Sequence, residues 1–436
     1  MRPPINTYIR SITSCTCGER HDITTKDVLI GKGVIHHIAT LFGPDMGGRP
    51  LILADMNTHA VAGKHVRELC AHASMHIEEL VLPGEVHADA HNLNIIAEGL
   101  TAHKATVAVA VGSGTINDLV KVAANDHDIP YLCVATAASM DGYLSANATI
   151  LTNGNKVPYS TIRPPIAVIA DTDIIRAAPE RMTLAGLGDA LGKITSIADW
   201  KLNHLLREEP FCLDTASMLR EEVADMLSYL AQAQSLSDDE FIQKLMRILV
   251  LTGTAMQRMG NSAPASGGEH CISHAMEMKG YACMGQAPSL HGLQVAYGLG
   301  KSLAAYCDLF DPEHAYDFAR TDVPAALRGH VSDWKNIGID LQGTIEKKAG
   351  LLARFRSSFS EIRNLADDDD FRFLLSAAPA VRMVAEEFSL PMRCADIDLM
   401  PEDARFAVLH AVDIRPRFTI FDLHFAADTI EAYASA

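Results

Sequence analysis

The sequence predicts an α/β domain built on a parallel sheet, followed by a domain made of helices. Up to about residue 178, short apolar segments rich in β-branched residues alternate with helix-like segments. This alternation indicates strand–helix–strand units, whose strands run parallel. Beyond that point, long segments with an apolar residue every three or four positions dominate, which is typical of a helical bundle. We therefore expect one domain over residues 1–178 and a second over 179–436.

Six short, bounded apolar segments are expected to form the buried strands of the sheet. They cover residues 28–31, 51–55, 77–82, 106–112, 131–136 and 166–171. Between them, 57–73 and 117–125 are expected to be helices, and 147–160 is expected to be a hairpin outside the sheet because it is centred on Asn153-Gly154-Asn155. The helices expected in the second half cover 185–206, 213–234, 238–259, 290–306, 343–365 and 371–388.

Composition limits the kinds of partner. The 37 basic and 54 acidic residues give a formal net charge of −17, which argues against a nucleic-acid-binding protein. The N-terminus lacks the apolar segment of a signal peptide, and no apolar run reaches the length of about 18 residues that a membrane span needs. Nine scattered cysteines are typical of a reducing compartment. We expect a cytoplasmic protein without a membrane span, and base rates favour a homodimer or higher homo-oligomer.

A glycine-containing segment, Gly112-Ser113-Gly114-Thr115-Ile116, ends an expected strand and opens an expected helix. Glycines let a ligand approach the backbone, and free amides at a helix start favour a phosphate. The dinucleotide fingerprint would need a third glycine and the P-loop would need a lysine. The sequence lacks both, so a phosphate cradle and an ordinary structural turn are both consistent with it.

Polar residues also follow two other expected strands. Asp55 ends the strand 51–55, where a carboxylate can accept hydrogen bonds from ribose hydroxyls or cap the next helix. The segment 136–142 follows the strand 131–136 with Thr136, Ser139 and Asp141. Ligands bind α/β sheets at the carboxyl ends of parallel strands, so these strand ends together favour a ligand site.

A carboxylate and three histidines in the helical half suggest a metal site. Asp189 lies among glycines, His270 and His274 are four residues apart, and His291 opens the next expected helix. On a helix, His270 and His274 project from the same face. One carboxylate with two imidazoles suits a divalent transition metal, and hydrogen-bonded core histidines are the alternative. Cys15-Thr16-Cys17 lacks the C-x₂-C spacing of zinc sites, so we expect a tight turn between N-terminal strands there.

Six motifs in order resemble the sn-glycerol-1-phosphate dehydrogenases, a family within the metal-dependent alcohol dehydrogenase and dehydroquinate synthase superfamily. They are GSGTIND, TAASMDGYLSA, PPIAVIADTDII, GLGDALGK, GGEHCISHAME and SLHGLQVAYG. The resemblance implies an α/β Rossmann-like N-terminal domain and an all-α helical-bundle C-terminal domain, with the site in the cleft between them. It also implies NAD(P)-dependent interconversion of dihydroxyacetone phosphate and sn-glycerol 1-phosphate.

The resemblance also implies roles for individual residues. Asp189, His270 and His291 would hold one divalent ion, with zinc the first expectation and nickel or iron the alternatives. Asp141, Asp189 and His274 would bind substrate, and Asp189 and His274 would act in catalysis. The residues implied to contact the cofactor are Asp55, Gly112, Ser113, Gly114, Thr115, Ile116, Thr136, Ala137, Ala138, Ser139 and Ser145. GSGTI and TAAS depart from the family's usual GGGTI and TAPS, but both keep small residues.

In the expected mechanism, the metal polarises the ketone oxygen while hydride arrives from the nicotinamide, and His274 or a metal-bound water supplies the proton. Asp55 would repel a 2′-phosphate and so favours NAD. Arg163 and Lys193 are candidates for binding the substrate phosphate. The alternatives are a glycerol or polyol dehydrogenase, a dehydroquinate-synthase-like lyase that retains NAD, and a catalytically inactive nucleotide-binding protein.

Overall fold

The computed structural model describes residues 5–43, 48–152, 155–318 and 322–434. The chain divides into two compact units. Unit 1 consists of Met1–Gly186 and Ala233–Asn261, and unit 2 consists of Leu187–Gln232 and Ser262–Ala436. This division differs from the expected boundary at 178/179, because unit 1 extends to Gly186 and also includes the later segment Ala233–Asn261, which was expected in the helical domain.

Unit 1 contains a six-stranded sheet with the order β1-β8-β5-β4-β2-β3, and every pair of neighbouring strands is parallel. The strands are β1 (Asp27–Gly31), β2 (Pro50–Asp55), β3 (Glu78–Leu82), β4 (Val107–Gly112), β5 (Tyr131–Ala135) and β8 (Ala167–Asp171). Each lies within or overlaps one of the six expected segments, so this prediction is confirmed. The central strands are apolar on both faces because helices cover both, as in other parallel sheets.

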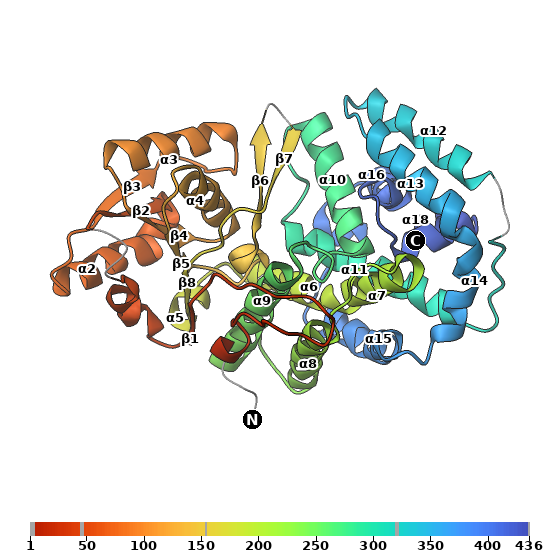
Figure 1. Cartoon of the computed structure of the whole chain (residues 1–436), viewed down its shortest axis with the longest axis horizontal. Helices are drawn as coiled ribbons and strands as arrows, with labels where there is room; N and C mark the ends of the chain where they lie inside the picture. Colours follow the sequence, from red (N-terminus) through yellow and green to blue (C-terminus); the bar gives the residue numbers. More distant parts are fainter. Residues whose placement is uncertain (1–4, 44–47, 153–154, 319–321, 435–436) are drawn as a thin grey trace. The chain divides into compact units, whose positions relative to one another are not determined.

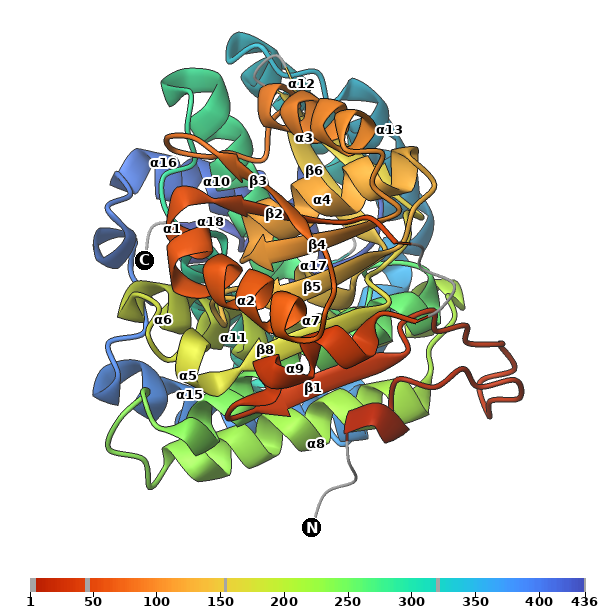
Figure 2. The same cartoon turned by 90° about the vertical axis from the view of Figure 1, so that its left-hand side faces the viewer.

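Helices lie on both faces of the sheet (Figure 2). The 3₁₀ helix η2 (Val34–Leu41) and α2 (Lys64–His72) lie in strand connections that lead toward the β3 edge of the sheet. The helices α3 (Ala90–Ala102) and α4 (Gly114–Asp126) lie in connections that lead back toward the β1 edge. Right-handed crossovers therefore place the two pairs on opposite faces. The core under η2 and α2 joins Ile38 and Val66 to Ile52 and Val109 of the sheet.

Shorter elements and a hairpin complete unit 1. A short helical segment, made of α1 (Met56–Thr58) and the π turn η4 (His59–Gly63), leads into α2, and α5 (Thr172–Ile175) follows β8. The antiparallel strands β6 (Asn147–Thr152) and β7 (Asn155–Ser160) form a separate two-stranded sheet, as expected for 147–160. The central residues of the expected hairpin, 153–154, lie outside the described residues. The later segment of unit 1, Ala233–Asn261, contains the long helix α9 (Asp239–Met259).

Unit 2 is made of helices (Figure 1), and the all-α prediction for its fold is confirmed. Its helices are the last turn of α6 (Glu180–Leu191), α7 (Lys193–Arg207), α8 (Leu213–Leu230), α10 (Gly268–Met284), α11 (His291–Phe310), α12 (Val323–Asn336), α13 (Gln342–Phe355), α14 (Phe359–Ile362), α15 (Asp369–Glu387), α16 (Pro401–Leu409), α17 (Ile420–Ala426) and α18 (Glu431–Ala434). Buried aromatic residues fill its core, and the rings of Phe359 and Phe418 meet edge to face with centroids 5.4 Å apart. Within the described residues, we find no helix with the length and hydropathy needed to cross a bilayer.

Two expected helices are divided in the structure. The segment 185–206 is two helices, because α6 ends at Leu191 and α7 begins at Lys193. Gly192 lies between them, where an added Cβ would come within 2.9 Å of Val295 Cγ1. The segment 343–365 breaks after Phe355 into α14 and two single 3₁₀ turns, η6 (Arg356–Ser358) and η7 (Arg363–Leu365). Hydrophobic periodicity continues across both breaks, so it could not locate them.

Candidate metal and nucleotide sites

The three residues expected to bind a metal come together in unit 2. Asp189 lies on α6, His270 on the first turn of α10, and His291 is the first residue of α11. Asp189 Oδ1 lies 3.4 Å from His270 Nε2, and the ring centroids of His270 and His291 are 5.3 Å apart. Residues separated by up to about a hundred positions in the chain thus converge on one small volume.

Glycines allow the helices to approach closely enough for this convergence. An added Cβ at Gly188 would lie 2.3 Å from the carbonyl oxygen of Gly292, so α6 and α11 touch through their backbones. A Cβ at Gly298 would lie 2.4 Å from the carbonyl oxygen of Glu269, so α10 and α11 touch in the same way. Neither position leaves room for a side chain, and the motif glycines are therefore packing residues.

Asp189 is completely buried and held ionised. Its Oδ1 accepts a hydrogen bond of 3.2 Å from Lys193 Nζ, and the same ammonium donates to the carbonyl oxygen of Ala265 at 2.7 Å. Burial would raise the pKa of Asp189, but the charges of Lys193, His270 and His291 outweigh it and hold this pKa well below its ordinary value. Lys193, one of the two candidates for binding the substrate phosphate, is thus engaged with the carboxylate instead.

Two buried carboxylates lie behind the histidines and orient them. Glu269 Oε1 accepts from His270 Nδ1 at 2.8 Å, which leaves Nε2 facing Asp189. Glu277 lies 3.4 Å from His274 Nδ1 through one oxygen and 3.3 Å from His291 Nδ1 through the other. Metal-binding histidines in proteins are oriented in this way by carboxylates that do not touch the ion. Neither glutamate was expected at this site from the sequence, although Glu269 directly precedes His270 and Glu277 is three residues from His274.

The surroundings of His270 act on its pKa in both directions. Burial and Lys193 lower it, but hydrogen bonds to Asp189 and Glu269 outweigh them, so the net shift is upward. Glu269 itself also accepts from Thr195 Oγ1 and from the amide of Gly267, each at 2.7 Å. Burial would raise the pKa of Glu269, but the hydrogen bond to His270 and the charge of that ring, together with these two bonds, hold the pKa below its ordinary value. An ionised Glu269 is the partner that a protonated Nδ1 requires.

His274 contacts an arginine from the C-terminal part of the chain. Arg415 Nη2 donates to His274 Nε2 at 2.9 Å, and Arg415 Nη1 donates to Ser262 Oγ at 3.0 Å and Ser266 Oγ at 2.9 Å. Burial, with Arg415 beside it, lowers the pKa of His274 to about 3, so this imidazole is neutral at neutral pH. Burial and the charge of Arg415 also lower the pKa of the neighbouring Arg417 to about 10. No role was expected for Arg415 or Arg417 from the sequence.

In unit 1, the three expected ligand segments lie at one edge of the sheet. Asp55, Gly112 and Ala135 end the adjacent strands β2, β4 and β5. The loops after β4 and β5 are tied together, because Ser113 Oγ lies 2.9 Å from Ser139 Oγ and the Thr136 amide donates to the Gly112 carbonyl at 3.2 Å. The helix α4 begins here with Ser113 as its N-cap, so its free amides face this edge.

Other predicted cofactor residues have identifiable contacts within unit 1. Asp55 caps α1, since its Oδ1 accepts from the Thr58 amide at 2.8 Å, so the capping alternative is realised. Ser145 is buried and bonded within the chain, accepting from Lys121 Nζ at 3.1 Å and donating to the Asn147 carbonyl at 2.8 Å. The remaining residues lie in the two loops or the first turn of α4, namely Gly114, Thr115, Ile116, Ala137 and Ala138.

Two further residues from the sequence analysis also lie in unit 1. Asp141 directly precedes the 3₁₀ turn η5 (Gly142–Leu144), in the loop that follows β5. Arg163 is about half exposed and pairs with Asp128. Its guanidinium is therefore engaged at the surface of the unit, which removes the support for Arg163 as a phosphate-binding residue. The loop position of Asp141 leaves its expected contact with substrate as a prediction.

Comparisons with known proteins agree with this architecture. Residues 29–179 match the family described as iron-containing alcohol dehydrogenase. The glycerol-1-phosphate dehydrogenase [NAD(P)+] of Halalkalibacterium halodurans is 35% identical over 293 residues, which are 66% of this chain and 72% of the relative. The enzyme of the same name from Pyrococcus horikoshii is 35% identical over 325 residues, 74% of this chain and 88% of the relative.

Solved structures show the same fold at much lower identity. A probable glycerol dehydrogenase from Sinorhizobium meliloti has a TM-score of 0.59 at 16% identity, over 94% of this chain and 97% of that one. A maleylacetate reductase from a Rhizobium species has a TM-score of 0.61 at 16% identity, over 95% and 96%. Their differing activities mean that the likeness concerns the fold alone.

Proposed function

The chain belongs to the glycerol-1-phosphate dehydrogenase family, and from this premise we propose that it interconverts dihydroxyacetone phosphate and sn-glycerol 1-phosphate with NAD(P) and one divalent ion. The observation that carries the proposal is the convergence of Asp189, His270 and His291 in unit 2. Their side chains come from three helices whose backbones touch, and two carboxylates orient the imidazoles.

The donor set fits a divalent transition metal. Asp189 offers an ionised oxygen. His270 offers Nε2 because Glu269 accepts from its Nδ1, and His291 offers Nε2 because its Nδ1 lies 3.1 Å from Ser273 Oγ and 3.3 Å from Glu277. Three protein ligands leave a coordination position for substrate, as in catalytic zinc sites. A bound ion would polarise the substrate ketone and stabilise the negative charge that develops on its oxygen. Zinc is our first choice, with nickel and iron as alternatives.

The residues around the ligands have separate tasks in this proposal. His274 is neutral, accepts from Arg415 through Nε2 and directs its Nδ1 proton toward Glu277, so it would act on substrate by positioning Arg415. Proton exchange between His274 and a substrate hydroxyl would require the Nδ1 contact with Glu277 to open. Arg415 and Arg417 would receive the substrate phosphate through the N–H groups that do not bond Ser262, Ser266 and His274, since a guanidinium has five donors and its fork matches phosphate oxygens. This pair favours a phosphorylated substrate over an uncharged polyol. Asp141 would orient a substrate hydroxyl.

The cofactor would bind at the carboxyl edge of the sheet in unit 1. The amides at the start of α4, from Ser113 to Ile116, would take the pyrophosphate, and the loop 136–139 would line the same site. Asp55 would take a ribose hydroxyl through the carboxylate oxygen that does not cap α1, and its charge favours NAD over NADP. Unit 1 is thus the nucleotide-binding domain and unit 2 the metal- and substrate-binding domain.

The setting of the enzyme is also part of the proposal. None of the nine cysteines, all of which lie in described parts of the chain, forms a disulfide, which supports a reducing, cytoplasmic location. A homodimer is the default assembly for such an enzyme. The acidic balance of the chain supports the absence of a nucleic-acid partner.

A cofactor-oxidation assay tests the function. Protein stripped of metal is reloaded with Zn²⁺, Ni²⁺ or Fe²⁺, and NADH and NADPH oxidation is followed with dihydroxyacetone phosphate and with dihydroxyacetone. We expect turnover of the phosphorylated ketone and formation of the sn-1 product on chiral analysis. Equal efficiency with dihydroxyacetone would indicate a polyol dehydrogenase. The absence of net NADH oxidation with either ketone would indicate a lyase or an inactive protein.

A further inference from the structure

The turn formed by residues 15–21 of unit 1 has no part in the proposed reaction. The amide of Gly18, whose φ is +86°, donates to the carbonyl of Cys15 at 3.0 Å, so the expected tight turn is confirmed. The expected flanking strands are not, because Ile12 and His21 form only an isolated antiparallel bridge. The bridge brings His21 back to the start of the turn.

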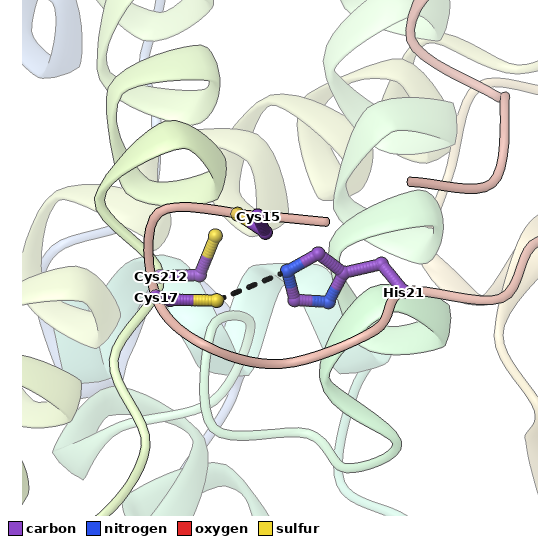
Figure 3. A group of neighbouring side chains, drawn as sticks. All are labelled: Cys15, Cys17, His21 and Cys212. Carbon is purple, nitrogen blue, oxygen red and sulfur yellow. Dashed lines mark hydrogen bonds between the residues drawn. The ribbon is translucent and has the colours of Figure 1, made fainter. Parts of the chain in front are cut away.

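This turn gathers two sulfurs and one imidazole nitrogen (Figure 3). Cys17 Sγ lies 3.3 Å from His21 Nε2, and the ligand atoms of Cys15, Cys17 and His21 all lie within 4.8 Å of one another. With Zn–S near 2.3 Å and Zn–N near 2.0 Å, a sulfur and a nitrogen on one tetrahedral zinc are about 3.5 Å apart. The 3.3 Å between Cys17 Sγ and His21 Nε2 is therefore close to the separation of two ligands of a single ion, and Cys15 lies near enough to be a third. Cys212, also drawn in Figure 3, belongs to unit 2.

The orientation of His21 is an independent observation. Its side chain is completely buried, and its Nδ1 lies 2.7 Å from the carbonyl oxygen of Arg258, in the last turn of α9. A carbonyl oxygen only accepts, so Nδ1 carries the proton and the lone pair of Nε2 faces Cys17. Proteins commonly orient zinc-binding histidines by such a bond to a backbone carbonyl.

We propose that Cys15, Cys17 and His21 bind one Zn²⁺ as a structural site in unit 1, separate from the metal centre of unit 2. Binding replaces the two thiol protons, which leave for solvent, by Zn–S bonds. The two thiolates balance the charge of the ion, and a further thiolate or a water completes the tetrahedron. Through His21 and Arg258, the ion ties the N-terminal segment to the end of α9.

A turn without zinc was expected from the sequence, because Cys15-Thr16-Cys17 lacks the C-x₂-C spacing of zinc sites and no second cysteine pair follows nearby. The structure supplies what spacing could not show. The third ligand is a histidine four residues after Cys17, and its orientation comes from Arg258, which is 237 positions away in the chain.

Cobalt substitution distinguishes this site from the one in unit 2. Metal-depleted protein is reloaded with Co²⁺, because thiolate ligands give a near-ultraviolet charge-transfer band that carboxylate and imidazole ligands do not. We expect the band in the unaltered protein and in His270→Ala. We expect it to be lost in Cys17→Ser and His21→Gln and kept in the matched control Cys283→Ser, whose cysteine is exposed on α10. No band in the unaltered protein would overturn the proposal.

Metal content gives a second readout. Fully loaded protein should hold two ions per chain, and His270→Ala and Cys17→Ser should each lose one of them. A single ion per chain that Cys17→Ser does not change would contradict the site, as would a mass two hydrogens lower, which would indicate a Cys15–Cys17 disulfide.

X-ray absorption keeps the proposal testable if the cysteine variant does not fold. Zinc-loaded His270→Ala protein should show at least two sulfurs and a nitrogen around the remaining ion. A third sulfur would also support the site and would mean that another cysteine completes it. A shell of nitrogen and oxygen alone would overturn it.

Discussion

The carboxylate of Glu269 lies 2.8 Å from Nδ1 of the next residue, His270. Adjacent residues on a helix rarely face each other, but Gly267 and Gly268 open α10, and at this helix start Glu269 turns back to accept the amide of Gly267. The same carboxylate therefore closes the helix start and selects the tautomer of the histidine. Metal affinity should depend on Glu269 although it is not a ligand.

Replacing Glu269 by glutamine should weaken metal binding by about 10- to 100-fold, the usual effect of losing a group that orients a ligand. The amide keeps the shape but not the charge that favours the protonated Nδ1. Competition with a chromophoric chelator measures the affinity. Glu402→Gln, at an exposed position on α16, is the control. If the two variants bind the metal with equal affinity, Glu269 does not orient His270 for metal binding.

His270→Ala should abolish metal binding in unit 2 and activity together, because the loss leaves Asp189 and His291 as the only two ligands. Metal analysis and the cofactor-oxidation assay should be made on the same sample, corrected for the ion we propose at Cys15, Cys17 and His21. A fully active variant that still carries the unit 2 ion would show that the metal centre has been misassigned.

Arg415→Ala should raise the KM for dihydroxyacetone phosphate by about 10- to 150-fold, which corresponds to the loss of a charged hydrogen bond worth about 1.5–3 kcal/mol. Cofactor affinity and the weak turnover of dihydroxyacetone should change little. Arg415→Lys should not rescue the KM, because a lysine lacks the planar fork. Arg163→Ala, which removes an exposed arginine, serves as the control. If phosphorylated and unphosphorylated ketones lose efficiency equally, Arg415 has only a structural role.

Asp141→Ala should leave the affinity for NADH unchanged and raise the KM for the ketone, since we place its carboxylate on a substrate hydroxyl. Fluorescence titration of NADH and steady-state kinetics separate the two effects. Unchanged kinetics with dihydroxyacetone phosphate would exclude the contact.

His424 should make the stability of the protein depend on pH. Burial lowers its pKa to about 4, and its Nε2 donates to the Ala305 carbonyl at 2.9 Å. In the unfolded chain the His424 imidazole is protonated near pH 6.5, whereas in the folded protein it is protonated only near pH 4. As the pH falls, the unfolded state therefore binds this proton first. The contribution of neutral His424 to the free energy of unfolding is fully present above pH 6.5. It decreases as the pH falls toward 4, by about 3 kcal/mol at most.

Urea unfolding from pH 7 to pH 4 measures this loss. His424→Gln has no proton to gain, so its free energy of unfolding should fall less steeply over that interval, although the variant is less stable at pH 7. Parallel curves for the two proteins would assign the acid sensitivity to other groups.

Sequence patterns predict features whose cause is local. Strands such as 107–112 are apolar at every position because both faces of the sheet are covered, and that signal needs no tertiary information. His270 and His274 are recognisable because a spacing of four puts them on one helix face. By contrast, Arg415 meets His274 across 141 positions, and no periodicity marks that contact. The break at Gly192 lies where an added Cβ would come within 2.9 Å of Val295 Cγ1 on another helix, a contact that the hydrophobic pattern of 185–206 does not show.

The backbone contacts at Gly188 and Gly298 have a consequence for how such a centre can change. Where helices meet without side chains between them, the gap separating the donor atoms is set by peptide groups, which cannot rotate aside as a leucine would. A single methyl group there would push whole helices apart and widen the cage around the ion. Substitutions at Gly188 and Gly298 can therefore change which metal the centre prefers without any change in the ligand residues.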